Sequence, residues 1–350
     1  MKNMKTSHLF LLITVLFPVV FLSETAHADY PYRNYDPLIT AFKDLAGSHP
    51  QLMSYGVVGK SVLGRDILMF RIGNPNGGRV LFDGAMHGNE AAGSELLYSL
   101  AVWLLDSNDS LANEILVRTC TLLIPVVNVD KENIQRKNAD GVDLNRNFAT
   151  GWPSRMGSTD PDNAAYQGPS QLSEPESQML VDVLEEYSPS FYVNLHMWAG
   201  PYYAGCRYAN RTFYPYLVDR INSLSMLRGV QPFHYSGEFG GEAMAIGDAA
   251  QLGITSFLIE LAENMVSLEE VRTTFLQKII PIASVLSQES KPTRNGDVNG
   301  DNKIDILDLI ILSNSFNAGP GNPNWNPNAD INGDGRVSIL DAIILASYFN

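Results

Sequence analysis

The stretch RVLFDGAMHGNEAAGSELLYSLAVWLL, residues 79–105, shows the pattern of a strand, a short polar motif and the pattern of a helix in direct succession. Its first residues form a near-continuous apolar run, which is typical of a strand buried on both faces of a sheet. Its second half carries leucines at the spacing of one helix face, at Leu96, Leu97, Leu100 and Leu104. Between the two patterns lies HGNE, with His87 and Glu90. A motif this short often occurs by chance, so its meaning depends on the rest of the chain.

Further apolar runs predict strands of the same buried kind. They are TCTLLIPVVNV at residues 119–129, SFYVNLH at 190–196 and ITSFLIEL at 254–261. Segments with helical periodicity separate these runs, which predicts an α/β fold with a largely parallel sheet and helices on both faces. One helix should begin within LSEPES at a capping box, with Ser173 as the N-cap and Glu176 as the third helical residue.

Length and charge narrow the class of protein. The chain has 350 residues and a formal net charge of −14, from 38 acidic and 24 basic side chains. This length fits one large domain plus a small one. The negative charge argues against nucleic acid and against an anionic membrane surface as partners.

Residues 1–28 have the features of a secretory signal peptide. Two lysines precede an apolar run that is too short to span a membrane, and AHA at residues 26–28 has the pattern of a cleavage site. No later stretch is long and apolar enough for a membrane span. We therefore expect a secreted, extracellular protein. Cys120 and Cys206 either pair or stay free, and Cys120 lies in a predicted buried strand.

Histidine is scarce after the predicted cleavage site, so few residues are available for an imidazole metal site. The candidates are His49, His87, His196 and His234. His87 and His196 each follow or end a predicted strand, and open α/β sheets bind ligands beyond the carboxyl ends of their strands. With Glu90 they would form a three-ligand zinc site that leaves one tetrahedral position open, which is the catalytic arrangement.

Other polar residues have both a structural and a chemical interpretation. Glu260 lies in the apolar run ITSFLIEL, where a carboxylate is costly to bury without a partner. It is either a salt-bridged core residue or a general base beside metal-activated water. The loop QRKNADGVDLNRNF, residues 135–148, contains Arg136, Asn145 and Arg146. It is either a solvated basic turn or a set of donors for a carboxylate and an oxyanion.

Taken in order, HGNE, RKNADGVDLNRNF, GPSQLSEPES, NLH and FLIEL resemble the motifs of the zinc carboxypeptidase family of the carboxypeptidase A and B type, over roughly residues 30–286. The resemblance implies a three-layer α/β/α fold with a mixed eight-stranded sheet. It also implies a role for each matching residue: His87, Glu90 and His196 as zinc ligands, Asp143 as the carboxylate that orients His87, Asn145 and Arg146 as the grip on the substrate's terminal carboxylate, Arg136 as the oxyanion donor and Glu260 as the general base.

The family usually has a mobile tyrosine over the substrate, and here the match is displaced. Tyr235 is the nearest candidate and lies slightly too early before a Gly-Gly pair. Glu238, Glu242 and Asp248 lie near the segment that shapes the pocket for the terminal side chain in the family. The preference for that side chain stays open.

The last part of the chain contains a repeat. GDVNGDNKIDILDLIILSNSF at residues 296–316 returns as ADINGDGRVSILDAIILASYF at 329–349. Each copy spaces oxygen-bearing residues as in a calcium loop and continues into a helix. The predicted calcium ligands are Asp297, Asn299, Asp301, Lys303, Asp305 and Asp308 in the first loop and Asp330, Asn332, Asp334, Arg336, Ser338 and Asp341 in the second, with Lys303 and Arg336 contributing backbone carbonyls. Two such loops, each followed by one helix, resemble a dockerin and imply a small all-α domain with two structural Ca²⁺ ions.

These patterns predict a signal peptide at residues 1–28, a zinc carboxypeptidase catalytic domain at 29–287, a linker at 288–295 and a dockerin-like calcium-binding domain at 296–350. The predicted function is that of a secreted metallocarboxypeptidase with one catalytic Zn²⁺, which acts on peptides or proteins with a free C-terminus. The dockerin-like domain would attach it to a cohesin-like scaffold or cell surface, or form a folded appendage.

Two other functions fit the same scaffold. One is a zinc amidohydrolase or peptidase for γ-glutamyl or cell-wall peptides, and the other is a non-enzymatic binding protein. Asn145 and Arg146 favour the carboxypeptidase, because their implied role is to hold a free carboxylate. Glu260 argues against the binding protein, which has no need for a general base.

Overall fold

The computed structural model describes residues 31–131, 135–197, 203–207, 213–232, 234–238, 243–261, 267–290, 296–298, 304–319, 322–331 and 336–349, with the backbone alone at 203–207, 213–214 and 234–238. The predicted signal peptide therefore lies outside the described residues. Among the described helices, none has both the length and the apolar character needed to cross a membrane.

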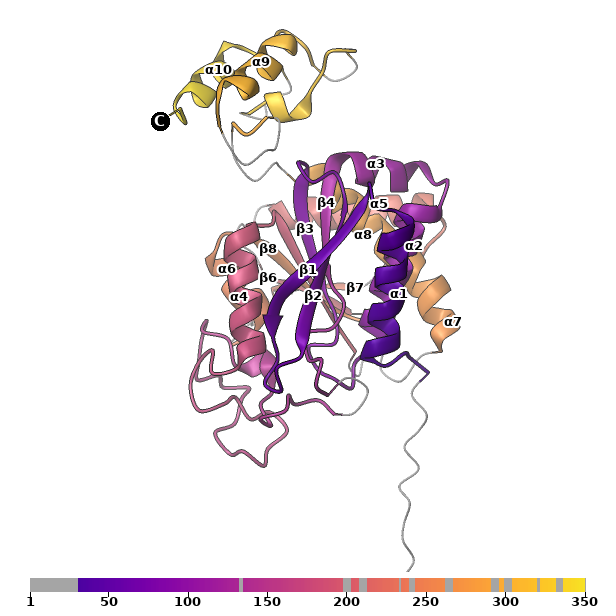
Figure 1. Cartoon of the computed structure of the whole chain (residues 1–350), viewed down its shortest axis with the longest axis vertical. Helices are drawn as coiled ribbons and strands as arrows, with labels where there is room; N and C mark the ends of the chain where they lie inside the picture. The colour runs from indigo at the N-terminus through magenta and orange to yellow at the C-terminus, as the bar shows by residue number, and fades with distance from the viewer. Residues whose placement is uncertain are drawn as a thin grey trace, which may run out of the picture. The chain divides into compact units, whose positions relative to one another are not determined.

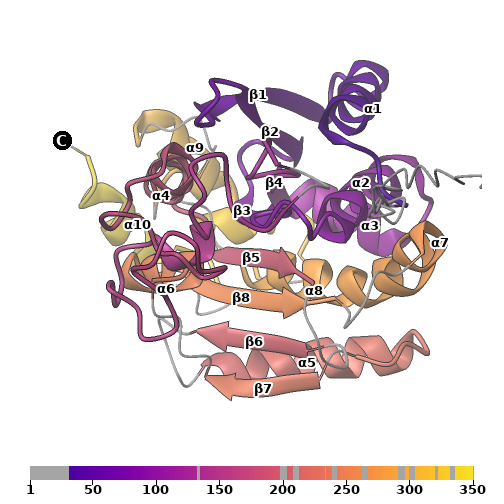
Figure 2. The same ribbon diagram turned by 90° about the horizontal axis from the view of Figure 1, so that it is seen from below.

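One eight-stranded sheet forms the centre of the larger part of the chain, with its strands in the order β1-β2-β4-β3-β5-β8-β6-β7. Figure 2 shows the strands succeeding one another across the sheet in this order. Their bounds are Met53–Lys60 (β1), Asp66–Gly73 (β2), Gly78–Asp83 (β3), Thr119–Ile124 (β4), Phe191–His196 (β5), Tyr203–Arg207 (β6), His234–Glu238 (β7) and Thr255–Glu260 (β8).

The sheet is mixed. Strands β4, β3, β5 and β8 run parallel to one another in the centre. Antiparallel pairs join β1 to β2, β2 to β4 and β6 to β8, and β7 pairs parallel with β6. The four apolar runs of the sequence are the four parallel strands β3, β4, β5 and β8, so this prediction is confirmed.

Helices cover both faces of the sheet (Figure 1). One layer contains α1 (Tyr35–Ser48), α2 (Ala92–Asp106), α3 (Ser110–Arg118), α5 (Phe213–Leu227) and α8 (Leu276–Glu289), with α7 (Leu268–Glu270) and the π-helix η2 (Val271–Phe275) leading into α8. The other layer contains α4 (Pro175–Tyr187) and α6 (Ala245–Gln251), which contact each other. This is the three-layer α/β/α arrangement predicted from the resemblance.

Helix α2 follows the HGNE motif, and its leucines are buried. Leu96, Leu97 and Leu100 have no exposed surface, and Leu104 is 1% exposed. Burial of each such side chain contributes about 1.5–3 kcal/mol relative to leaving it exposed. The predicted apolar helix face is thus confirmed, and it anchors α2 on the sheet.

The predicted capping box of α4 is wrong. The N-cap is Glu174, without a side-chain capping hydrogen bond, and the helix begins at Pro175. The Glu176 carboxylate instead accepts hydrogen bonds from Val62 N (3.1 Å) and Asn138 Nδ2 (3.2 Å). Tertiary partners have therefore replaced the local bond that the pattern predicts, because Glu176 is fully buried against two other segments.

The C-terminal repeat forms two helices, α9 (Ile306–Asn314) and α10 (Ile339–Ala346), which contact each other, together with the 3₁₀-helix η3 (Pro327–Ala329). Their own small core contains Val298, Leu312, Ala329, Ile331, Val337 and Leu345. The N-caps are Asp305 and Ser338, each in a capping box with the acidic residue three positions later, Asp308 or Asp341. The all-α prediction for this domain is consistent with these elements, and the exact domain boundaries stay a prediction.

Several predicted calcium ligands lie outside the described residues, namely Asn299, Asp301, Lys303, Asn332 and Asp334. Of the others, Asp308 and Asp341 are fully buried, and Asp297 is 4% exposed. Asp308 and Asp341 accept capping-box hydrogen bonds from Asp305 N (2.8 Å) and Ser338 N (2.7 Å). Their role as calcium ligands stays a prediction.

Cys120 is a free, buried thiol in β4. Cys206 belongs to β6, whose side chains lie outside the described part of the structure. Strands β3, β5 and β8 separate β4 from β6 in the sheet, so the two cysteines do not face each other as a disulfide requires.

Candidate metal centre

A sharp turn after β3 carries the HGNE motif. Ala85 has a φ of 46°, in the left-handed region that residues other than glycine rarely adopt. Two hydrogen bonds hold the turn in place, from Val127 N to the Gly84 carbonyl (3.1 Å) and from Asn128 N to the Ala85 carbonyl (3.0 Å). The loop after β4 therefore holds this strained turn, and strain of this kind concentrates at functional sites.

Glycine is required within the motif. A Cβ atom at Gly88 would lie 2.1 Å from the carbonyl oxygen of Lys131, which is closer than any non-bonded contact. The missing side chain lets the motif lie against this neighbouring backbone. His87 and Glu90, on either side of the tight turn, can then face the same point.

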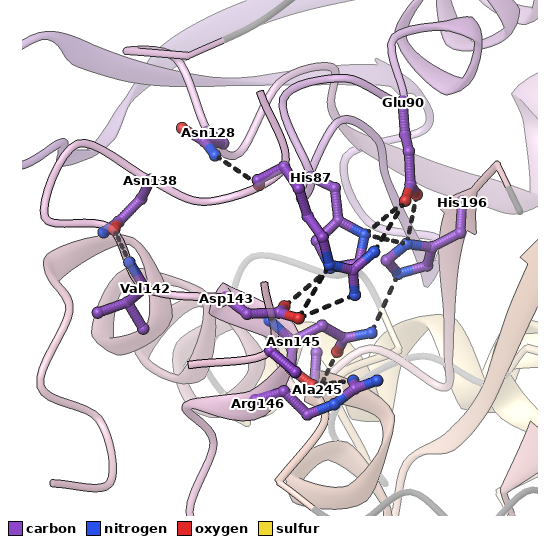
Figure 3. Close-up of polar contacts among 12 residues, drawn as sticks. His87, Glu90, Asn128, Asn138, Val142, Asp143, Asn145, Arg146, His196 and Ala245 are labelled. Carbon is purple, nitrogen blue, oxygen red and sulfur yellow. Dashed lines mark hydrogen bonds and ion pairs between the residues drawn. The ribbon is translucent and has the colours of Figure 1, made fainter. Parts of the chain in front are cut away.

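His87, Glu90 and His196 come together at the carboxyl edge of the parallel strands (Figure 3). Glu90 Oε1 lies 2.7 Å from His87 Nδ1, and Glu90 Oε2 lies 2.8 Å from His196 Nδ1. The two Nδ1 atoms are 3.2 Å apart. Both imidazoles and the carboxylate thus turn one ligand atom each toward a common centre, and all three residues are buried.

Each histidine turns its other ring nitrogen toward an oxygen acceptor. His87 Nε2 lies 3.0 Å from Asp143 Oδ1, and His196 Nε2 lies 2.6 Å from Asn194 Oδ1. An Nε2–H donated to these oxygens leaves the Nδ1 lone pair free to bind a metal. The contact with Asp143 is the one that the resemblance implies.

Charges within the cluster stabilise one another. Burial raises the pKa of Glu90, but the neighbouring His87 and His196 outweigh this effect and leave it well below its ordinary value. Burial lowers the pKa of His87, yet the Glu90 and Asp143 carboxylates raise it more, so the net shift is upward. The raised pKa means that His87 binds a proton more tightly. A divalent cation between these residues would take the place of that proton, since it supplies positive charge to the same carboxylates.

The 135–148 loop supplies the second side of the site. Arg136 donates from Nε to Asp143 Oδ2 (3.0 Å), and its Nη1 lies 3.3 Å from Glu90 Oε1. Asn145 Nδ2 lies 3.3 Å from His196 Nε2, and its Oδ1 accepts a hydrogen bond from Ala245 N (3.3 Å). Arg136 and Asn145 thus lie directly beside the predicted ligands, as Figure 3 shows for Asn145.

Arg146 follows in the 3₁₀-helix η1 (Leu144–Arg146). Its guanidinium donates to the carbonyl oxygens of Asn145 (2.7 Å) and Met156 (3.2 Å). Burial lowers its pKa, partly offset by Asp143. Among the described residues no carboxylate forms an ion pair with it, so the guanidinium retains donors for an external anion.

A second layer of hydrogen bonds fixes the loop itself. Asn138 accepts from Val142 N (2.9 Å) and donates to Glu174 Oε2 (2.6 Å) and Glu176 Oε2 (3.2 Å). Both glutamates lie at the start of α4 and are buried. The loop that positions Asp143 is therefore held by α4, which explains why Glu176 faces inward.

Glu260 ends β8 and pairs in register with His196 at the end of β5. Among the described residues, its Oε2 atom is buried without a hydrogen-bond partner. Burial raises the pKa of Glu260, His196 lowers it and Glu90 raises it, with a net rise. A buried carboxylate oxygen without a donor points to a ligand or water as its partner.

The remaining predicted residues have different outcomes. Tyr235 lies in β7, and its side chain is outside the described part of the structure. Asp248 is in α6, where its oxygens accept hydrogen bonds from Ala149 N (2.9 Å) and Thr150 N (2.6 Å). Asp248 therefore fastens the chain after η1 to α6, and its carboxylate is already engaged. Glu238 and Glu242 have no described side chain.

Sequence reasoning missed Asp83 and Asn194, which lie behind His196. Asn194 bonds both to His196 and to Asp83, and both residues are fully buried. The signal was present, because each is a polar residue inside an apolar strand where burial without a partner is costly.

The residues present fit a zinc ion. Two imidazole nitrogens and one carboxylate are a ligand set of catalytic zinc sites, and both histidines have the outer hydrogen bonds that such ligands need. The unpartnered oxygen of Glu260 lies beside this set. Fold and site together define an α/β/α protein with a candidate mononuclear metal centre at the carboxyl edge of its sheet.

The chain belongs to the zinc carboxypeptidase family, whose model matches residues 38–216, and it carries a dockerin type I domain at residues 295–350. It is 25% identical to carboxypeptidase B of Bos taurus over 220 residues, covering 56% of this chain and 49% of that protein. It is 23% identical to mast cell carboxypeptidase A of Rattus norvegicus over 194 residues, covering 49% and 47%. The chain thus spans about half the length of these curated relatives.

Solved structures support the same fold. The carboxypeptidase A of Helicoverpa armigera superposes with a TM-score of 0.61 at 20% identity, covering 73% of this chain and 74% of that chain. At this identity the likeness shows the fold alone. It confirms the α/β/α architecture predicted from the resemblance.

Proposed function

We propose that this protein is a zinc-dependent carboxypeptidase that removes residues from the free C-terminus of peptides or proteins. The observation that carries the proposal is the convergence of His87, Glu90 and His196 beside Glu260, whose buried Oε2 has no hydrogen-bond partner among the described residues. When bound, zinc supplies Lewis-acid chemistry and lowers the pKa of water near its site. One such ion fits the ligand set.

Glu260 is the proposed general base. Its carboxylate takes a proton from the attacking water and returns it to the nitrogen of the leaving amino acid, so the peptide C–N bond breaks and one water is consumed. The raised pKa of Glu260 suits this role, because it makes the ionised carboxylate a stronger base toward water.

Arg136 is the proposed oxyanion donor. It lies within hydrogen-bonding distance of Glu90 and Asp143, so its guanidinium is held beside the metal ligands. About 30% of its side chain remains exposed. A fixed cation at this place stabilises negative charge that develops on the carbonyl oxygen.

Arg146 and Asn145 are the proposed binding groups for the terminal carboxylate. Two charge-assisted hydrogen bonds of roughly 1.5–3 kcal/mol each correspond to about 10²–10⁴-fold in kcat/KM. Arg146→Ala should reduce kcat/KM by this order for peptides with a free C-terminus. Steady-state kinetics on matched pairs of free and amidated peptides measure the effect.

The wild type should scarcely cleave the amidated peptides. Lys137→Ala is the matched control, because it removes a cation of the same loop whose Nζ, within the described part of the chain, bonds the Pro161 and Asn163 carbonyls. That variant should retain wild-type kinetics. Equal cleavage of free and amidated peptides by the wild type would reject the carboxypeptidase and favour an amidohydrolase.

The dockerin type I domain is the proposed attachment module, for calcium-dependent binding to a cohesin-like scaffold outside the cell. Apolar side chains at equivalent positions of the two helices are exposed by about half or more: Ile306, Leu307 and Ile310 on α9, and Ile339, Leu340 and Ile343 on α10. Exposed apolar surface of this extent marks an interaction surface.

Calcium should be needed for this domain to fold. Without cations the carboxylates within each predicted loop repel one another, and they include the buried Asp297 and Asp308 in the first loop and Asp341 in the second. The small core of the domain does not compensate for this cost. We expect the full chain to lose helical circular dichroism and to become sensitive to proteolysis after residue 290 when Ca²⁺ is chelated.

A chain that ends at residue 290 is the control for this experiment. Its circular dichroism should not respond to Ca²⁺, and its turnover of small peptides should equal that of the full chain. Identical spectra of the full chain with and without Ca²⁺ would contradict the two-calcium proposal.

A further inference from the structure

A continuous chain of buried hydrogen bonds lies behind His196. His196 Nε2 lies 2.6 Å from Asn194 Oδ1, and Asn194 Nδ2 donates to Asp83 Oδ1 at 2.6 Å. Tyr192 donates its hydroxyl to the other oxygen of Asp83 at 2.7 Å. Asp83, Asn194 and Tyr192 have no exposed surface, so water does not compete for these bonds.

The backbone register explains why these side chains meet. Asp83 of β3 and Asn194 of β5 are direct partners in the parallel ladder. Tyr192, Asn194 and His196 alternate along β5 and therefore point to the same face of the sheet. The positions of all four side chains are fixed by strands of the central sheet rather than by a loop.

The chain of bonds determines which way the Asn194 amide faces. An ionised carboxylate only accepts hydrogen bonds, so the Asn194 NH₂ group must face Asp83 and the carbonyl oxygen must face His196. That oxygen also only accepts, so the hydrogen of a neutral His196 must be on Nε2. Nδ1, which faces Glu90 and His87, then keeps its lone pair.

Both oxygens of Asp83 accept hydrogen bonds, from Asn194 Nδ2 and from the Tyr192 hydroxyl, as those of an ionised carboxylate do. Burial raises its pKa to about 6, although these two bonds lower it. Asn145 Nδ2 also approaches His196 Nε2, at 3.3 Å. The contact with Asn194 Oδ1 is much shorter and therefore decides the tautomer.

We propose that Asp83 and Asn194 are positioning residues that fix the tautomer and ring orientation of His196 for the metal. This inference rests on the proposed zinc site. Asp143 contacts His87 directly, and Asp83 would orient His196 in a comparable way through Asn194.

The neutral amide between His196 and the carboxylate has a chemical consequence. Glu260 is paired in register with His196, and Glu90 already raises its pKa. A carboxylate in place of Asn194 would bring a further negative charge toward Glu260. With the neutral amide at position 194, Asp83 still orients His196, and its negative charge stays farther from the proposed general base Glu260.

Asn194→Leu, which keeps the branching of the side chain but has no acceptor, tests the proposal in the full chain. The zinc dissociation constant, measured by competition with a chelator, should rise roughly 10–100-fold. In the metal-free protein, ¹⁵N NMR of His196 should show the Nε2–H tautomer in the wild type and its loss in the variant.

The paired exchange Asp83→Asn with Asn194→Asp is the rescue. It restores an acceptor for His196 and a donor from position 83, so zinc affinity should return to the wild-type value. Asp83→Asn alone should give a zinc affinity between those of the wild type and Asn194→Leu. An amide at position 83 can both donate and accept, so it no longer determines which way the Asn194 amide faces. Ser225→Ala is the control. It removes a buried hydrogen bond to the Ile221 carbonyl in α5, outside this chain of bonds, so it should lower the melting temperature without changing zinc affinity.

Wild-type zinc affinity in Asn194→Leu, or a dominant Nδ1–H tautomer in the metal-free wild type, would overturn the positioning role. If Asn194→Leu does not fold, the zinc affinity of the double variant Asp83→Asn with Asn194→Asp tests the proposal instead. A double variant that folds but lacks wild-type zinc affinity would also overturn the proposal. A wild type that binds no zinc but shows the Nε2–H tautomer would instead reject the proposed function and leave the orientation of His196 established.

Discussion

Glu260→Gln should bind zinc and substrate but hydrolyse peptides very slowly. We expect kcat to fall roughly 10²–10⁴-fold, the contribution typical of a positioned general base. The amide keeps the shape and polarity of the side chain but cannot take a proton from water. KM should change little, because the terminal carboxylate is held by other residues. Steady-state kinetics together with the zinc content of the purified variant measure both effects.

The pH profile offers a second measure of the same group. Burial raises the pKa of Glu260 above its ordinary value of 4.5. The base is active when ionised, so kcat/KM should fall as the pH drops through this raised pKa. The acid limb should therefore lie above pH 4.5 in the wild type and be absent from the residual activity of Glu260→Gln.

Glu185→Gln is the matched control for this variant. Glu185 is an exposed residue of α4, so the same chemical change there should leave kcat, KM and the pH profile unaltered. Near-normal turnover by Glu260→Gln with full zinc content would assign the base to a different residue.

The central part of the fold was predictable from local sequence. Strands β3, β4, β5 and β8 are buried on both faces, and a continuous apolar run is the pattern that such burial produces. The outer strand β1 alternates buried and exposed positions irregularly around two glycines, so its pattern is weak. The eight-strand count came from the family resemblance and not from these runs.

The metal ligands were predictable for a geometric reason. His87 and His196 follow or end parallel strands, whose carboxyl ends meet at one edge of the sheet. Asp83 and Asn194 could be singled out as polar residues in apolar strands, but the bond between them was not predictable, since they are 111 positions apart in sequence. Only the strand order, with β3 beside β5, brings them together.

Substitution of either histidine ligand should remove zinc from the protein. His87→Ala and His196→Ala each leave two of the three proposed ligand side chains, and a loss of at least about 10²-fold in affinity is expected, beyond the 10–100-fold cost of losing an outer hydrogen bond. Metal analysis after dialysis at neutral pH should find less than one zinc per chain, and peptide hydrolysis should disappear with the metal. Chelation of the wild type should have the same effect, reversed by added zinc.

His49→Ala separates this result from a general effect of losing an imidazole. His49 lies at the end of α1, where its Nε2 is 2.9 Å from Asp106 Oδ1, and it takes no part in the metal centre. This variant should hold one zinc and remain active. Each ligand variant also removes one of the two imidazoles that contact Glu90, and His87→Ala removes the imidazole partner of Asp143 as well. Their melting temperatures should therefore fall even without metal. Full zinc occupancy in both ligand variants would reject His87 and His196 as the zinc ligands, whatever their effect on stability.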